Sequence, residues 1–459
     1  MIRSFFVMTI SSPDLLEGGL ARLAALALIL LLAAPARGED TSVDPLRQWP
    51  SWRGPLGTGV APHASPPLHF GEEQNIRWKI PLPGKGHASP VVWKDHVFLL
   101  TAIPTGDPVP PRPDPAPGAH DNLPVTYRQK FSALAVSRTD GRLLWLTTLH
   151  EALPHEGAHS TATLASASPV TDGDHVFAFF GSYGLYCLDT LGRTQWEKSF
   201  GRMQSLHGHG EGSSPVLHGD TLVVNWDHEG PSFLVALDKR TGEQLWKMER
   251  DEATSWASPI IATIDGKPQV IVSGTTRIRG YDLETGKVIW ECGGLSSNVV
   301  ATPVFGGGLL FAGSSYDFMN LMAIRLEGAR GDLTRTDRVI WTRRRGTSYV
   351  PSPLLYGDSL YFLRHYQGIL SRVEATTGKD VHSPLRLPGV DDIYASPVGA
   401  AERIYITDRD GVTMVVGHEG QAKILARNTL SDSFSATPAL VGHDLILRGE
   451  KSLYCIAQE

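Results

Sequence analysis

Ala257-Ser258-Pro259 is one of eight places in this sequence where a small residue, then Ser or Thr, then Pro opens a short apolar run. The other seven are Ala88-Ser89-Pro90, Ala167-Ser168-Pro169, Ser213-Ser214-Pro215, Ala301-Thr302-Pro303, Pro351-Ser352-Pro353, Ala395-Ser396-Pro397 and Ala436-Thr437-Pro438. From Pro169 onward, successive prolines are 46, 44, 44, 50, 44 and 41 residues apart. Repeats of about 40–50 residues made of short strands are typical of a β-propeller with one four-stranded blade per repeat. The motifs therefore predict an all-β fold, an eight-bladed β-propeller of four-stranded antiparallel blades.

The stretch from Pro215 to Trp246 illustrates the sequence pattern of one blade. Short β-rich runs are separated by Gly-containing turns, which is the pattern of consecutive hairpins. The outermost strand carries a Trp, and we expect this large side chain to fill the space that opens between blades at the rim. The tryptophans expected in this docking role are Trp78, Trp145, Trp196, Trp246, Trp290 and Trp341.

The two ends of the repeat region complement each other. The last blade starts at Pro438 and stops at Leu453-Tyr454-Cys455-Ile456, so its fourth strand is missing. Asn75-Ile76-Arg77-Trp78 reads as an outer strand without a blade of its own. Pairing the two removes exposed sheet edges. We therefore predict that this N-terminal outer strand completes the last blade and closes the ring.

Two insertions interrupt the period. The first two motifs are 79 residues apart, and residues 103–128, rich in Pro and Asp, fall between the second and third strands of blade one. This composition favours an extended loop over a packed core. Residues 327–338 lengthen the last hairpin of blade five.

The chain divides into three predicted parts. Residues 1–36 resemble a secretory signal, because Arg22 precedes the apolar run 23–34 and Ala34-Pro35-Ala36 suits cleavage. That run is short for a membrane span, although an uncleaved anchor is the alternative. Residues 37–74 form a lead segment, whose Trp49-to-Pro55 stretch we expect to be held against the propeller, and residues 75–459 form the propeller. The predicted location is the periplasm or cell envelope of a bacterium, with no membrane span after cleavage.

Composition narrows the class of partner. The net charge is −6, with 41% hydrophobic and 20% charged residues, and no long basic run occurs, which argues against a nucleic-acid partner. We expect a monomer. Of the three cysteines, Cys187 and Cys455 occupy equivalent positions in non-adjacent blades, so free buried thiols are predicted instead of a disulfide between these two.

The outer half of the third repeat, residues 236–246, resembles the tryptophan-docking repeat of the pyrroloquinoline quinone (PQQ) dehydrogenases, and residues 281–290 resemble it as well. The resemblance covers about residues 75–459. It extends to PQQ-like propellers without enzyme activity, including the propeller lipoprotein of the outer-membrane barrel-assembly machinery. Trp-Arg-Gly-Pro at 52–55 and Gly-His-Ala-Ser-Pro at 86–90 are similar to those of exported bacterial propellers of unassigned role. The resemblance implies the fold and leaves the activity open.

The sequence departs from the dehydrogenase pattern in two respects. The resemblance implies an adjacent Cys-Cys pair that stacks on the quinone, and this chain has no adjacent cysteines. It also implies oxygen ligands for Ca²⁺ beside a catalytic Asp, and no motif here matches them. No catalytic residue is predicted.

Histidines gather before the inner strands of blades one to three, where loops share one face, the mouth of the propeller. Neutral imidazoles beside carboxylates can hold a metal such as Zn²⁺. The alternative is that the imidazoles are solvated or hold loops in place, which this spacing favours because it matches no known metal motif. The candidate ligands are His155, His159, His207, His209 and His228.

Aromatic and polar residues occupy the other loops of the mouth. Such a mixture suits a small-molecule or peptide site, and it equally suits packing between loops. The candidate ligand-face residues are His87, Trp256, Tyr349, Arg364, His365, Tyr394 and Phe434.

The sequence favours an exported, non-catalytic PQQ-like propeller that binds a protein or small molecule at its mouth, because rings of loops on a rigid body suit recognition. The alternative is a quinone- or metal-dependent oxidoreductase with its site at the His-rich mouth of blades one to three. In that case the cofactor is PQQ or a divalent metal.

Overall fold

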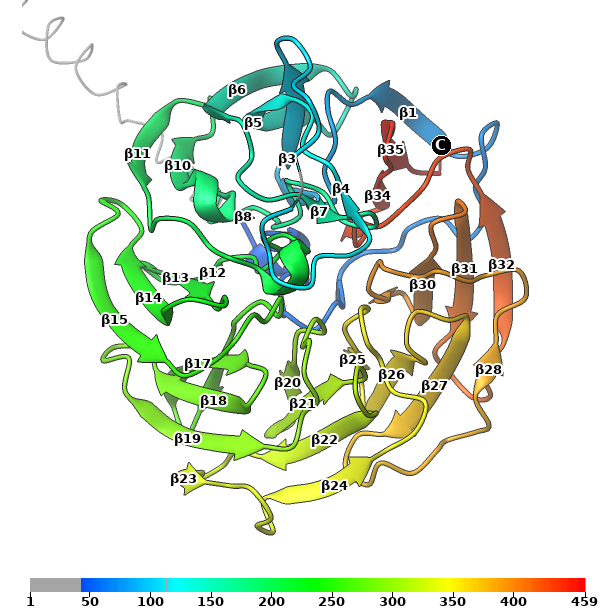
Figure 1. The fold of residues 1–459 in the computed structure, drawn as a ribbon. Coiled ribbons are helices and arrows are strands. Elements are labelled where there is room, and N and C mark those ends of the chain that lie inside the picture. The colour runs from blue at the N-terminus through cyan, green and yellow to red at the C-terminus, as the bar shows by residue number, and fades with distance from the viewer. Residues whose placement is uncertain (1–42, 113, 459) are drawn as a thin grey trace, which may run out of the picture. The chain divides into compact units, whose positions relative to one another are not determined.

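The computed structural model describes residues 43–112 and 114–458. Residues 44–112 and 114–458 belong to one compact unit, in which eight antiparallel sheets surround a common centre (Figure 1). The eight-bladed propeller predicted from the repeat is therefore confirmed. The helices of the described residues are three 3-10 turns, η1 (Pro45–Arg47), η2 (Gly181–Tyr183) and η3 (Leu206–Gly208).

The first four blades follow chain order from the inner to the outer strand. Blades one and two contain β2 (Val91–Trp93), β3 (His96–Thr105), β5 (Arg128–Ser137) and β6 (Leu143–Ala152), then β8 (Val170–Thr171), β9 (His175–Phe179), β10 (Leu185–Asp189) and β11 (Thr194–Lys198). Blades three and four contain β12 (Val216–His218), β13 (Thr221–Trp226), β14 (Ser232–Asp238) and β15 (Gln244–Arg250), then β16 (Ile260–Ile264), β17 (Lys267–Ser273), β18 (Arg277–Asp282) and β19 (Val288–Gly293).

The next three blades continue in the same way, and the eighth borrows its outer strand. Blades five and six contain β20 (Val304–Gly306), β21 (Leu309–Ser314), β22 (Asn320–Arg325) and β24 (Val339–Arg343), then β25 (Leu354–Tyr356), β26 (Ser359–Leu363), β27 (Ile369–Glu374) and β28 (Leu385–Arg386). Blades seven and eight contain β29 (Val398–Ala400), β30 (Arg403–Thr407), β31 (Val412–Gly417) and β32 (Ile424–Thr429), then β33 (Ala439–Val441), β34 (Asp444–Arg448), β35 (Ser452–Ile456) and β1 (Ile76–Pro81).

The N-terminal strand closes the ring as the sequence predicted. β1 pairs antiparallel with β35, placing Trp78 opposite Cys455. The buried Asp444 carboxylate reinforces the junction by pairing with Arg77 of β1 at 2.9 Å and with Arg138 of blade one at 3.1 Å. The two ends of the propeller are thus joined by a hydrogen-bonded ladder and a shared carboxylate.

Five outer-strand tryptophans connect their blade to the next one. Each indole ring lies against the glycine of the turn before the next blade's outer strand, where an added Cβ would collide with the ring. Each indole N–H also donates to a backbone carbonyl of that turn. These bonds run from Trp78 to Arg138, Trp145 to Thr190, Trp196 to Lys239, Trp246 to Leu283 and Trp341 to Ala375, at 2.8–2.9 Å.

Trp290 of blade four departs from this pattern. Its indole N–H donates to Gln269 within the same blade at 2.9 Å, and its ring lies against Gly280. The turn of blade five that would receive it is the lengthened hairpin, which carries β23 (Gly331–Asp332). β23 pairs in parallel with β19 and adds a fifth strand to blade four. The insertion thus replaces the usual contact between these two blades.

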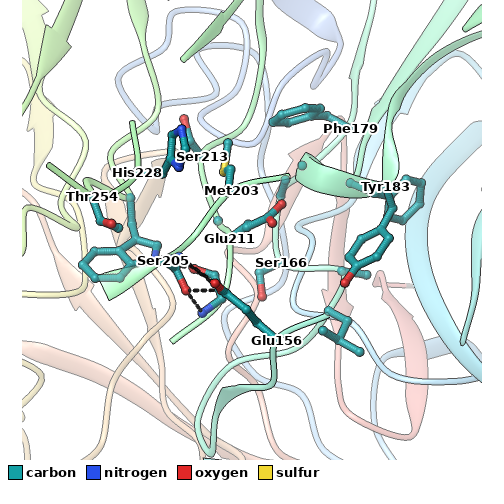
Figure 2. A pocket seen from close by; sticks show the side chains of 18 of the residues that line it. Glu156, Ser166, Phe179, Tyr183, Met203, Ser205, Glu211, Ser213, His228 and Thr254 are labelled. Atoms are coloured by element: carbon teal, nitrogen blue, oxygen red, sulfur yellow. Dashed lines mark hydrogen bonds between the residues drawn. The ribbon is translucent and has the colours of Figure 1, made fainter. Parts of the chain in front are cut away.

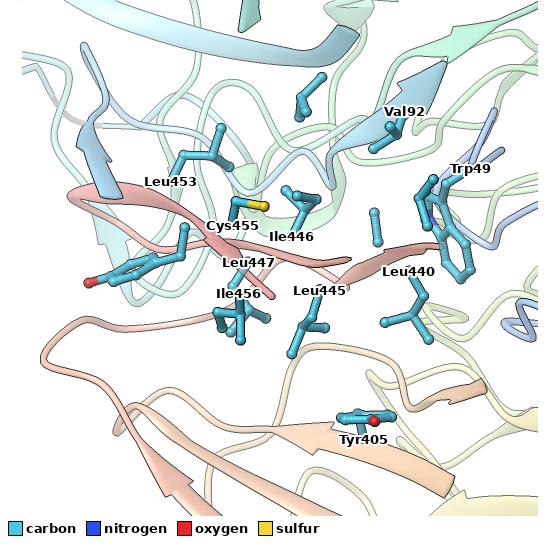
Figure 3. Packing of buried hydrophobic residues seen from close by; sticks show 14 of the residues in the cluster. Trp49, Val92, Tyr405, Leu440, Leu445, Ile446, Leu447, Leu453, Cys455 and Ile456 are labelled. Carbon is cyan, nitrogen blue, oxygen red and sulfur yellow. The ribbon is translucent and has the colours of Figure 1, made fainter. Parts of the chain in front are cut away.

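The lead segment is built into the propeller. Trp49 is fully buried and exchanges two backbone hydrogen bonds with Val92 of β2, at 2.8 and 2.9 Å. Figure 3 shows the Trp49 ring among the apolar side chains of blade eight. The buried Arg53 guanidinium donates to the backbone carbonyls of Pro353 and Pro397, at 2.7 and 3.0 Å. The lead segment therefore reaches the inner strands at the centre of the ring.

The Pro-rich insertion of blade one forms a loop that reaches the neighbouring blade. The ladder between β3 and β5 extends to Thr105 and Arg128, so the loop itself is residues 106–127. Its β4 (Asn122–Leu123) pairs with β7 (Ala158–His159) in the connection between blades one and two. This pairing fixes the insertion at the mouth.

Cys187, Cys292 and Cys455 are free and buried, and burial raises the pKa of each thiol, to about 12, 11 and 12 respectively. Within the described ranges, no helix has the length and apolar character needed to cross a membrane. The predicted signal segment, residues 1–36, lies outside the described residues.

Candidate functional site

The Ser or Thr of each repeat motif links neighbouring blades. The backbone N–H of each of these residues donates to the side-chain hydroxyl of the matching residue in the next blade, and the eighth returns to the first. The donor–acceptor pairs are Ser89–Ser168, Ser168–Ser214, Ser214–Ser258, Ser258–Thr302, Thr302–Ser352, Ser352–Ser396, Ser396–Thr437 and Thr437–Ser89, at 2.8–3.1 Å. We call these eight residues the hydroxyl ring.

A cavity of about 410 Å³ occupies the centre of the mouth. All eight members of the hydroxyl ring line it, and Trp52 of the lead segment contributes to the same lining. The loops that precede the inner strands supply most of the remaining lining, as the topology requires. This volume lies within the range of small-molecule sites in proteins.

One wall of the cavity is an arc of tyrosines from blades five to seven, Tyr316, Tyr349, Tyr366 and Tyr394, which we call the tyrosine arc. The ring centroids of Tyr316 and Tyr349 are 5.9 Å apart, and those of Tyr366 and Tyr394 are 6.0 Å apart. His365 lies between the two pairs, 6.2 Å from Tyr349 and 6.3 Å from Tyr366. Loops from three blades thus form one continuous aromatic surface.

Four histidines gather where the insertion meets the loops of blades two and three, and we call His120, His159, His207 and His209 the histidine cluster. The ring of His209 lies 4.7 Å from His159, 4.9 Å from His120 and 5.4 Å from His207. Burial and the neighbouring imidazoles lower the pKa of His209 to about 4, and burial is the main cause of a lowered pKa at His159. These two imidazoles are therefore neutral at pH 7.

The five histidines predicted as metal ligands do not all lie together in the structure. His159, His207 and His209 belong to the cluster. His155 instead bonds the Tyr183 hydroxyl and the Met203 carbonyl, at 3.0 and 2.8 Å. The buried His228 accepts the backbone N–H of Gly230 in its own loop and that of Gln204 in the connection between blades two and three. Within residues 43–112 and 114–458, no three His, Cys, Asp or Glu side chains are arranged to hold a metal ion.

A smaller pocket of about 40 Å³ adjoins the cavity and contains two glutamates (Figure 2). Glu156 accepts hydrogen bonds from the backbone and hydroxyl of Ser205, while Glu211 accepts them from the backbone and hydroxyl of Ser182. Burial, with a smaller contribution from Glu156, raises the pKa of Glu211 to about 7. Burial likewise raises the pKa of Glu156. The buried amide of Asn225, whose two polar atoms have no hydrogen-bond partner among the described residues, also lines this pocket, which is large enough for water.

The acidic loop after β13 has a structural role. Asp227 forms a bidentate ion pair with Arg250 at 2.7 and 2.9 Å, and both side chains are fully buried. The Ser255 hydroxyl donates to the same carboxylate at 2.7 Å. With its oxygens occupied in this way, Asp227 is unsuited to act as a free acid or base.

The seven predicted ligand-face residues are found in different places. Those that line the cavity are His87, Trp256, Tyr349 and Tyr394. His365 lies between tyrosines of the arc, and Arg364 is exposed beside it. Phe434 is instead fully buried, and its ring packs 5.7 Å from that of Tyr454.

Several contributors to the cavity were not predicted from the sequence, among them Trp52, His120, Asn298 and Tyr316. The first two belong to the lead segment and the insertion, which carry no repeat position to place them. Tyr316 follows the second strand of blade five, at the position equivalent to the predicted loop of blade six. Comparing these equivalent loops would have found it.

Tryptophan-docked blades around a central cavity define a propeller of the PQQ-repeat type. A family model described as "Outer membrane protein assembly factor BamB" matches residues 126–384, more than half of the chain, and the protein belongs to this family. The resemblance stated from the repeats is thereby confirmed.

Individual relatives are more distant. An "Outer membrane protein assembly factor BamB" from Francisella salina is 23% identical over 205 residues, 40% of this chain and 36% of the relative. The chain thus matches only about a third of that relative's length. The crystal structure of BamB from Moraxella catarrhalis superposes with a TM-score of 0.55 at 15% identity, covering 82% of this chain and 98% of that one. The computationally designed Ika8 protein has a TM-score of 0.53 at 11% identity, covering 86% and 100%. Both structural likenesses concern the fold alone.

The cavity does not fit the quinone after which these repeats are named. PQQ carries several carboxylates, and burying such charges requires cationic or multiple hydrogen-bonding partners. Among the described residues, the lining contains no Lys or Arg, and its one charged group is the carboxylate of Glu211. Each of the three cysteines lies in a different blade, so no adjacent pair is available to stack on a quinone ring.

Proposed function

We propose that this protein is an exported, non-catalytic binding or scaffolding module of the bacterial cell envelope. Its recognition surface is the mouth of the propeller, the face that carries the central cavity.

The observation that carries this proposal is the construction of the mouth. The hydroxyl ring and the docked tryptophans join the blades rigidly, while the loops supply a cavity of about 410 Å³ with one aromatic and one imidazole wall. Side chains on a rigid support lose little freedom on binding, which favours recognition. Tyrosine and tryptophan are also enriched at interfaces, because each combines a large apolar ring with a polar group.

The envelope location and the scaffolding role rest on different support. The family description names an outer-membrane assembly factor, which suggests an exported protein with protein partners. The signal-like residues 1–36 agree with export. The chain matches only 36% of the length of the Francisella salina relative, so the proposal extends to the general role of a scaffold.

The oxidoreductase alternative has less support. The cavity lining suits neither a carboxylate-rich quinone nor a metal ion held by three or more protein ligands within the described residues. The strongest acid–base candidates, Glu156 and Glu211, have their carboxylates engaged by serine hydrogen bonds. Glu156 faces only a pocket of about 40 Å³, whereas Glu211 also lines the central cavity.

Site-specific photo-crosslinking in the cell tests the proposal. A crosslinking amino acid replaces Tyr366 at the mouth or, as a matched control, the exposed His218 on the hairpin at the opposite end of the inner strand of blade three. We expect a discrete crosslinked species from envelope fractions only for the Tyr366 position. Equal crosslinking from both positions, or a protein found only in the cytoplasm, would contradict the proposal.

A parallel assay addresses the alternative directly. Purified protein incubated with PQQ and Ca²⁺ should show no dye-linked oxidation of alcohols above the level of free PQQ. Saturable quinone binding with alcohol oxidation would overturn the non-catalytic assignment.

A further inference from the structure

The central cavity is polar but almost uncharged. Glu211 is the one lining residue among those described that carries a carboxylate, and Lys and Arg are absent from the lining. The nearby arginines are already engaged: Arg53 and Arg448 donate to backbone carbonyls, and Arg409 pairs with Asp392 at 2.9 Å. A buried charge without a partner is costly, so this cavity disfavours strongly anionic ligands.

The hydroxyl ring presents donors to this cavity. Each ring hydroxyl accepts a backbone N–H, so its oxygen is oriented by the neighbouring blade while its own proton remains available. Among the hydrogen bonds of the described residues, none uses a ring hydroxyl as the donor. A ligand with several acceptor oxygens would satisfy donors that the protein itself leaves free.

Further lining atoms lack partners. The Oδ1 of Asn298, a residue only 3% exposed, and the buried atoms Ser435 Oγ and His209 Nε2 have no hydrogen-bond partner within the described residues. A buried polar atom left unpaired costs about 1–3 kcal/mol. An amide oxygen needs a donor, whereas a hydroxyl group can serve as either partner. The lining as a whole therefore calls for a ligand that both donates and accepts.

The tyrosine arc adds apolar surface of a particular shape. Within the two tyrosine pairs the ring centroids are 5.9 and 6.0 Å apart and the ring planes are inclined by only 31° and 24°, so the paired rings present similar faces along the wall. The Arg409 guanidinium lies 5.0 Å from the ring of Tyr394, so this aromatic face already contacts a cation of the protein itself. A row of aromatic rings without an enclosing cage suits flat apolar faces better than a compact cation.

We propose that the central cavity binds a neutral saccharide of one or two sugar rings. The apolar face of a sugar ring packs on the tyrosine arc, while its hydroxyls pair with the hydroxyl ring and with Asn298. A saccharide is the ligand class that combines dense donors and acceptors, no charge and an apolar face. A cavity of about 410 Å³ accommodates such a molecule. This inference rests on the proposed recognition role of the mouth and names its ligand class.

Titration of the purified protein with defined sugars tests the inference. The probes are glucose, N-acetylglucosamine, maltose and cellobiose, with glucuronic acid and choline as charged comparisons. Binding is followed by calorimetry and by tryptophan fluorescence, because Trp52 and Trp256 both line the cavity. We expect saturable binding of at least one neutral sugar and weaker binding of both charged probes.

Matched variants locate the site. Tyr349→Ala and Tyr366→Ala each remove one ring of the arc, and we expect each to weaken sugar binding by about tenfold or more. Tyr366 is 39% exposed, so its removal should leave the fold intact even if Tyr349→Ala is unstable. Tyr127→Ala, a similarly exposed tyrosine that does not line the cavity, should bind like the unaltered protein.

Three results would overturn the inference. They are an absence of binding for every neutral sugar, a preference for glucuronic acid or choline, and sugar binding that Tyr366→Ala leaves unchanged. If no sugar binds but the Tyr366 position still crosslinks to an envelope component, the mouth is a recognition surface and only the ligand class is wrong. Failure of both experiments would reject the proposed function itself.

Discussion

The roles of the Ser or Thr and the Pro of each repeat motif, and of Glu211, become clear only from their contacts in the structure. The Ser or Thr of each motif is explained by the hydroxyl ring, since only a short side-chain hydroxyl reaches the N–H of the preceding blade. Proline then follows where the inner strand faces the centre of the ring, so its missing N–H leaves no gap in a ladder. Glu211 is the contrasting case, an acid at the edge of the cavity whose burial is only partly compensated by Ser182.

Glu211 should make stability depend on pH in a predictable direction. Its pKa is raised to about 7 from an ordinary value of 4.5, so the folded state favours the protonated acid. The stability that the folded state gains from the protonated Glu211 is therefore complete below pH 4.5 and is lost as the pH rises through 7. We expect Glu211→Gln, which resembles the protonated form, to match the unaltered protein at pH 4.5 and to be more stable at pH 8.5.

The gain at pH 8.5 should be about 1–2 kcal/mol, after allowance for screening of a site that adjoins the open cavity. Thermal unfolding at both pH values measures it. Glu243→Gln, at an exposed turn, serves as the control and should show no pH-dependent difference. A Glu211→Gln gain at pH 4.5 as large as that at pH 8.5 would contradict the burial argument.

At the scale of the strand, the contacts of each outer-strand tryptophan depend on the turn that the next blade presents to it. Where the next turn presents a glycine and a free carbonyl, the tryptophan docks across the boundary, as Trp246 does against Gly286 and Leu283. Where the turn is lengthened, Trp290 bonds within its own sheet and β23 covers the edge instead. The same outer-strand pattern therefore has two structural outcomes, decided by the neighbour.

Trp78 tests ring closure, because it docks the borrowed strand β1 onto blade one. Its side chain is 8% exposed, and its indole N–H bonds the Arg138 carbonyl at 2.8 Å. We expect Trp78→Ala to cost about 3–5 kcal/mol in the free energy of unfolding. Trp78→Phe should cost less, because it keeps a ring against Gly141 and loses one hydrogen bond worth about 1 kcal/mol. Denaturant unfolding measures both, and an unchanged midpoint for Trp78→Ala would contradict the docking role.

For the whole molecule, closure depends on residues that lie outside the repeat. The lead segment contributes Trp49 to the core beside blade eight, and its Phe70 backbone N–H bonds the Asn428 side chain of blade seven at 2.9 Å. Arg53 bonds blades six and seven from the centre. One extended segment thus contacts both ends of the ring and its axis, which opposes opening between blades one and eight.

Two shortened chains separate these contributions. A chain that begins at residue 73 keeps β1 but lacks Trp49, Arg53 and Phe70, and we expect it to fold with a lower melting temperature. A chain that begins at residue 81 leaves the edge of β35 unpaired, and we expect it to aggregate. Size-exclusion chromatography and calorimetry distinguish the outcomes. A chain from residue 81 that stays monomeric with an unchanged melting temperature would contradict this account of closure.

The sequence by itself determined the number of blades and the way the ring closes. Both follow from local patterns, because the Ser-Pro spacing repeats and the missing last strand has its match in residues 76–78. The sequence also indicated the mouth as the site, and four of the seven predicted ligand-face residues, including Tyr349 and Trp256, line its cavity.

Tertiary structure alone decided which side chains meet there. The ring of His120, from the insertion, lies beside that of His209, and the ring of Tyr316 lies beside that of Tyr349. His155 instead forms a hydrogen bond with Tyr183 and is not part of the histidine cluster. The physical reason is that a blade is specified by short-range hydrogen bonding and alternation along the chain. The neighbours of a loop side chain depend instead on loop conformations and on contacts between separate blades, which no single repeat encodes.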